Sequence, residues 1–92
     1  MSRYEFAGRE PGVKLALGWD APLGTFFLQI ESEEDDEPLL WHGRRYGECP
    51  EPGPLVTLAR RWSNEVPAGL LARLFADELA QPAQPRQPRP VR

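Results

Sequence analysis

Few side chains in this sequence have the chemistry that catalysis requires. The chain holds one histidine, His42, and one cysteine, Cys49. A thiol and an imidazole can form a nucleophile and base pair, with Asp20 available as the carboxylate that orients the imidazole. Nothing in their spacing brings the three side chains together, and no backbone donors for an oxyanion are indicated. We therefore predict that the protein is not an enzyme and has no catalytic residues.

Metal and nucleotide sites are also poorly supported. One histidine and one cysteine are too few for a four-ligand zinc site. The run ESEEDDE lacks the glycine and the spaced terminal glutamate of an EF-hand loop. No glycine-rich phosphate loop follows any expected strand. We expect neither a metal nor a cofactor.

The strongest compositional feature is an acidic run, in which six of the seven residues from 31 to 37 are negatively charged. Its candidate interface residues are Glu33, Glu34, Asp35, Asp36 and Glu37. One hypothesis is a docking surface, or nucleic-acid mimic, that competes for a basic groove on a partner. The other is a solvated loop. Its charge would discourage edge-to-edge pairing of sheets and keep the protein in solution.

Charge and length narrow the possible functions further. A chain of 92 residues forms one domain with a thin core. Residues 1 to 80 hold eight basic and fourteen acidic residues, a net charge of −6, which argues against nucleic acid as a direct ligand. The start of the chain, MSRYEFAGREPG, has no apolar run of signal-peptide or membrane-spanning length, and one cysteine cannot form an internal disulfide. We therefore expect a cytoplasmic protein that does not enter a membrane.

Hydrophobic periodicity predicts a small sheet. Apolar residues at every second position predict a strand over residues 12 to 19. Runs of aromatic and β-branched residues predict further strands over residues 25 to 31 and 39 to 43, and residues 4 to 7 are a candidate for a short extra edge strand. Short connections favour a three-stranded antiparallel meander, with that extra strand as a fourth.

The sequence DAPLG, residues 20 to 24, connects the first two of these strands. Pro22 suits the second position of a type I turn and Gly24 its fourth. Asp20 can fold its carboxylate onto nearby backbone N–H groups. Asp20 is therefore better explained by turn formation than by catalysis.

Two amphipathic helices are predicted after the sheet. Pro54 suits the first turn of one helix, and Pro67 is expected to start the other in the same way. The apolar face of the first helix comprises Leu55, Leu58, Ala59 and Trp62. That of the second comprises Leu70, Leu71, Leu74, Phe75 and Leu79. We predict an α+β domain over residues 1 to 80 with both helices on one sheet face, then a disordered proline-rich tail over residues 81 to 92.

Helices on one side leave the other sheet face exposed. If Phe26, Leu28 and Ile30 face the helices together with Leu39 and Trp41, then Phe27 and Leu40 point the other way. Phe27 and Leu40 are therefore candidate interface residues in an exposed apolar patch. A register slip of one residue would exchange the two faces.

The order of these motifs resembles that of a family of small, uncharacterised bacterial proteins. The resemblance rests on GWDAPLGTFF, then the acidic stretch, LLWHG and VPAGLLARLFADELA, and it covers residues 4 to 80. The family has no established activity, so the resemblance transfers no catalytic residue. His42 and the segment GECPEPGP depart from its usual pattern.

These observations favour a small non-enzymatic module that binds another protein or regulates it. The alternative is an acidic inhibitor of a nucleic-acid-handling enzyme, of the anti-defence type. In either case we expect a protein partner and a chain that is itself a monomer or a weak homodimer.

Overall fold

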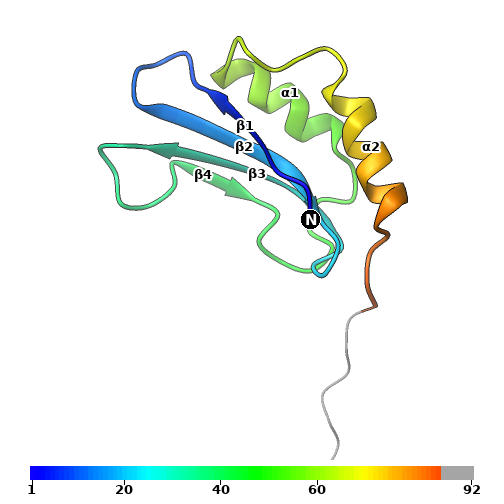
Figure 1. Cartoon of the computed structure of the whole chain (residues 1–92). Coiled ribbons are helices and arrows are strands. Elements are labelled where there is room, and N and C mark those ends of the chain that lie inside the picture. Colours follow the sequence, from blue (N-terminus) through cyan, green and yellow to red (C-terminus); the bar gives the residue numbers. More distant parts are fainter. Residues whose placement is uncertain (86–92) are drawn as a thin grey trace, which may run out of the picture.

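The computed structural model describes residues 1–85 and has the predicted α+β architecture (Figure 1). The strands form an antiparallel meander in the order β1 (Tyr4–Ala7), β2 (Val13–Asp20), β3 (Thr25–Ser32) and β4 (Leu40–His42). The helices that follow are α1 (Gly53–Trp62) and α2 (Leu70–Ala80). The short edge strand at residues 4 to 7 is therefore confirmed, and the sheet has four strands.

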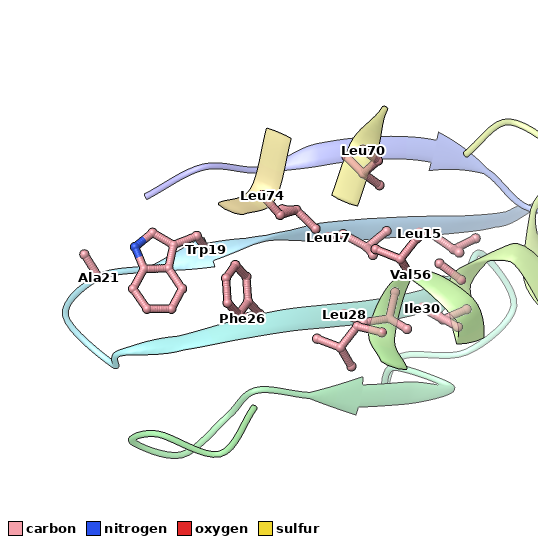
Figure 2. Packing of buried hydrophobic residues seen from close by; sticks show 12 residues of the cluster. Leu15, Leu17, Trp19, Ala21, Phe26, Leu28, Ile30, Val56, Leu70 and Leu74 are labelled. Carbon is pink, nitrogen blue, oxygen red and sulfur yellow. The ribbon is translucent and has the colours of Figure 1, made fainter. Parts of the chain in front are cut away.

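Cross-strand pairs between β2 and β3 form the centre of the core. Leu15 lies opposite Ile30, Leu17 opposite Leu28, and Trp19 opposite Phe26, and all six side chains are fully buried. Figure 2 shows them on the same side of the sheet, beneath Leu70 and Leu74 of α2 and Val56 of α1. The α1 helix contacts β2 and β3, and α2 contacts β2. The period-two pattern therefore predicted the face that the helices cover.

The turn between β2 and β3 forms as its residues predict. The Gly24 N–H donates to the Ala21 carbonyl at 3.1 Å, and the Leu23 N–H donates to the Asp20 carboxylate at 3.1 Å. Gly24 has a positive φ of 58°, a conformation that glycine adopts without steric cost. Asp20 is therefore occupied in holding the turn.

The predicted apolar face of the second helix is wrong in part. Pro67 precedes α2, which begins at Leu70, where the Leu70 N–H donates to the Pro67 carbonyl at 3.2 Å. The sheet side of α2 includes Asp77, whose carboxylate accepts a hydrogen bond from the Tyr4 hydroxyl at 2.6 Å. Phe75 and Leu79 consequently point away from the sheet, with 41% and 80% of their surfaces exposed. Leucine and phenylalanine spacing alone did not reveal that a carboxylate faces the sheet.

The predicted register of β4 is also wrong by one residue. Leu40 pairs with Ile30 and packs against the core, whereas Trp41 pairs with Gln29 and lies on the opposite face. Cross-strand neighbours share a face, so Leu40 belongs to the helix side and is not part of an outward patch with Phe27. Three consecutive apolar residues contain no alternation, so their sequence could not fix which of them points inward.

The first residues after α2 are fastened to the sheet. The indole N–H of Trp19 donates to the Gln81 carbonyl at 2.6 Å, and the Gln84 N–H donates to the Ala21 carbonyl at 2.9 Å. The predicted disordered tail covered residues 81 to 92, of which residues 86 to 92 lie outside the described part. Within residues 1–85, neither helix has the length and apolarity needed to cross a bilayer.

Gly43, directly after β4, allows the chain to pass close to β3. It has a φ of 88°, and a Cβ atom at this position would lie 2.7 Å from the Phe27 Cα and closer still to the Phe26 carbonyl oxygen. Gly47 has a similar φ of 66°, but a Cβ atom there would meet nothing within 4 Å. The two glycines therefore share a backbone conformation and differ in their surroundings.

We expect Gly43→Ala to destabilise the protein far more than Gly47→Ala. The left-handed conformation costs either variant about 1 kcal/mol, whereas Gly43→Ala also forces two backbone segments apart and should lose about 3 kcal/mol in total. Urea denaturation of both variants measures the difference. Equal losses of stability would show that Gly43 is needed for its backbone conformation and not for close packing against β3.

Candidate functional site

The sheet face opposite the helices, which we call the outer face, is the main candidate surface. Its central row runs from Glu5 through Ala16 and Gln29 to Trp41. Ala16 is only 3% exposed although no helix lies over it, whereas Trp41 is 41% exposed. The outer face is therefore largely sealed by its own side chains, with Trp41 as a large apolar group that remains accessible.

Phe27 lies on the outer face as predicted, but it is buried. Its direct neighbour on β2 is Gly18, and a Cβ atom on Gly18 would lie 2.7 Å from the Phe27 ring. The ring therefore rests over a strand position that has no side chain, and only 7% of Phe27 remains exposed. Phe27 supports the outer face and offers little surface to a partner.

Trp41 is held by a cationic neighbour. The guanidinium carbon of Arg44 lies 4.5 Å from the centre of the indole ring, within cation–π distance. Trp41 was not predicted as a surface residue because the predicted register of β4 is wrong by one residue. The sequence did offer one indication of the contact, because Arg44 follows Trp41 at the three-residue spacing of a tight turn.

A loop closed by Glu48 follows Trp41. The Glu48 carboxylate accepts hydrogen bonds from the backbone N–H groups of Gly43, Arg44 and Arg45 at 2.9 to 3.2 Å. These hydrogen bonds, above all that of Gly43, lower the pKa of Glu48 below its usual value. The carboxylate thus fixes the chain immediately after β4 and keeps Arg44 next to Trp41.

Residues 33 to 37 of the predicted acidic run lie in the exposed connection between β3 and β4, whereas Glu31 and Ser32 belong to β3 and are half-buried. All five residues from 33 to 37 are exposed, and no side chain among them makes an ion pair within residues 1–85. The Glu33 N–H anchors the connection by donating to the Gly12 carbonyl at 2.9 Å. A shallow cleft of about 510 Å³ adjoins it, and Glu5, Lys14, Glu31 and Glu33 are among its lining residues. The acidic run therefore extends into a groove with more acidic than basic side chains.

Cys49 and His42 lie at two ends of the Glu48 loop. The Cys49 thiol lies 4.0 Å from the Glu48 carboxylate. Burial, followed by the charge of Glu48, raises the pKa of Cys49, so the reactive thiolate is disfavoured. Asp20 is held in the β2–β3 turn. Among residues 1–85, no group of His, Cys, Asp and Glu side chains could hold a metal ion.

The comparisons with protein-family models, curated proteins and solved structures find no match to this chain. The geometry of the surface is therefore what indicates a function. The resemblance to a small bacterial family stays a prediction.

We expect Phe27→Ala to destabilise the protein by about 3 kcal/mol, because it removes a buried ring. Trp41→Ala on the same face should cost about 1 kcal/mol or less, because much of the indole is already exposed. Thermal and urea denaturation of the two variants provide the comparison. A larger loss for Trp41→Ala would mean that Trp41 is a structural residue.

Glu48→Gln should destabilise the protein at neutral pH and progressively less in acid. A carboxylate whose pKa is lowered on folding stabilises the native state above its unfolded value of 4.5, and this contribution is lost as the pH falls through the lower folded value. Urea denaturation from about pH 7 to pH 3 should therefore show that the free energies of unfolding of the variant and the wild-type protein converge as the pH falls. Glu51→Gln, at an exposed residue outside the loop, is the control at neutral pH. A difference that stays constant down to the lowest pH would contradict the role of the charge.

Proposed function

We propose that this protein is a small non-enzymatic module that binds a basic protein partner through a surface centred on Trp41. The supporting observation is that Trp41 is 41% exposed on a sheet face over which no helix lies. Tryptophan is among the residues that most often dominate binding energy at protein interfaces. Because β4 and Arg44 already restrict the indole, less side-chain freedom is lost when a partner binds.

Charge supports a basic partner. The cleft that adjoins the acidic run contains Glu5, Glu31 and Glu33 against Lys14, and the exposed residues 34 to 37 continue the negative charge. Residues 1–85 carry a net charge of −6. A partner with lysine or arginine around an apolar contact would complement both features and would be drawn in by electrostatic steering.

The raised pKa of Cys49 and the use of Asp20 in a turn support a binding role over a nucleophilic one. Cys49 is a free cysteine without a disulfide partner, which supports a reducing, cytoplasmic environment.

An acidic inhibitor of a nucleic-acid-handling enzyme is the second candidate. It is favoured by the exposure of all five residues from 33 to 37 and by their lack of ion pairs within residues 1–85. A mimic of a phosphate backbone needs such unneutralised charges in a row. This candidate depends on the acidic run and does not require Trp41.

The two candidates differ in what Trp41→Ala does to partner capture. If Trp41 anchors the interface, the tagged variant should lose the partner that the wild-type protein retains, with affinity at least about 30-fold weaker. Leu79→Ala is the matched control, because Leu79 is an exposed apolar residue on α2 and should keep the partner. Quantitative mass spectrometry of the captured proteins, followed by calorimetry with the identified partner, measures both.

A variant in which residues 33 to 37 are neutralised tests the inhibitor candidate. Changing these acids to Gln and Asn should weaken binding moderately and reduce its salt dependence if they only steer the partner. If the variant loses all binding while Trp41→Ala binds normally, the inhibitor candidate replaces the Trp41 interface. If Leu79→Ala alone loses the partner, both candidates are wrong.

A further inference from the structure

The β1 strand lies at the edge of the sheet. One part of this edge is hydrogen-bonded to other residues, and the other part is not. Hydrogen bonds join Ser2 to Trp19 at 2.9 Å and Gly8 to Val13 at 2.7 Å, so even-numbered residues of this segment bond to β2. In an antiparallel pair, the alternate residues direct their N–H and C=O groups to the other side. The backbone groups of residues 3, 5, 7 and 9 therefore point away from β2.

The last residue of α1 and the connection between α1 and α2 cover the later part of this edge. The Ala7 N–H donates to the Glu65 carboxylate at 3.2 Å, and the Ser63 hydroxyl donates to the Ala7 carbonyl at 2.6 Å. The Arg9 N–H donates to the Trp62 carbonyl at 2.7 Å. These contacts take the place of a neighbouring strand, so the edge cannot be extended beyond Ala7.

The earlier part of the edge adjoins empty space. Within residues 1–85, nothing bonds to the outward backbone groups of Arg3 and Glu5. A cleft of about 530 Å³ lies here instead, bounded by residues 3 to 6 on one side and by the start of α2, including Leu70 and Arg73, on the other. An open strand edge of this kind is a template for pairing with another strand.

The charges on this edge would complement those on the same edge of a second copy. Arg3 and Glu5 lie two residues apart and form an ion pair of 3.1 Å on the exposed surface. In an antiparallel pairing of two copies centred on Tyr4, Arg3 would lie opposite Glu5 of the second copy, and Glu5 opposite its Arg3. A pairing centred on Arg3 or on Glu5 would instead place like charges opposite each other, which is destabilising.

From these observations we propose that β1 pairs with β1 of a second copy, centred on Tyr4, to form a weak symmetric dimer. Arg3 and Glu5 supply both the free backbone groups and the charge complementarity. The symmetry axis is perpendicular to the sheet, so the two outer faces lie on the same side of a continuous sheet. Two Trp41 surfaces would then face the same way, which allows bivalent binding. The pairing itself does not depend on the proposed binding function.

Charge reversal tests the pairing directly. Sedimentation velocity of the full chain from micromolar to millimolar concentration should show reversible dimer formation. Arg3→Glu or Glu5→Arg alone should weaken the dimer at least about tenfold, because each places like charges opposite each other. The double variant should restore dimerisation, since it exchanges the charges without changing their complementarity. Thermal denaturation of each variant checks that the monomer remains folded.

Cysteine cross-linking tests the register. In a Cys49→Ser background, Tyr4→Cys should give a disulfide-linked dimer, because opposite residues of a non-hydrogen-bonded pair lie about 4.5 Å apart at Cα. Ala7→Cys should not, because Ala7 lies away from the symmetry axis. A chain that stays monomeric throughout, a double variant that fails to restore the dimer, or a dimer that survives both single reversals would overturn the proposal. The last result would indicate another interface, such as Phe75 and Leu79 on α2.

Discussion

The burial of Trp19 is the constraint on which the rest of the structure depends. Its ring packs on Phe26 with ring centres 4.7 Å apart, so it fixes the ends of β2 and β3 next to their turn. Its backbone bonds to Ser2, and its indole N–H needs an acceptor, which Gln81 provides at 2.6 Å. The Gln81 side chain in turn accepts a bond from the Met1 ammonium at 2.7 Å. Trp19 therefore ties the first residues of the chain and the segment directly after α2 to the end of the sheet next to the turn.

A sheet covered by helices on one side must seal its second face without them. Here the outer face does so with small residues, since Gly18 leaves room for the Phe27 ring and Gly43 lets the chain pass close to β3. The result is that Ala16 and Phe27 are buried while Trp41 at the sheet edge is not. The distinction between a supporting and an accessible aromatic residue thus arises from the glycines beside them, and not from the aromatic residues themselves.

The sequence predicted those elements whose pattern is unambiguous. Strict alternation before Trp19 and the turn chemistry of Asp20 identified the β2–β3 hairpin. The side of Leu40 and the accessibility of Trp41 could not be derived, because a run of consecutive apolar residues fits both registers. The role of Glu48 depends on three backbone N–H groups converging on it, a feature that only folding creates.

The excess negative charge affects the two proposed associations in opposite ways. Residues 1–85 carry a net charge of −6 and the full chain one of −3, so two copies repel each other at long range while a basic partner is attracted. Salt screens charges beyond about 8 Å at physiological ionic strength, so it weakens the attraction of a basic partner and relieves the repulsion between copies. Only short-range complementarity, such as that of Arg3 with Glu5, can then favour self-pairing. The acidic run would therefore select a basic partner and, at the same time, keep any dimer weak.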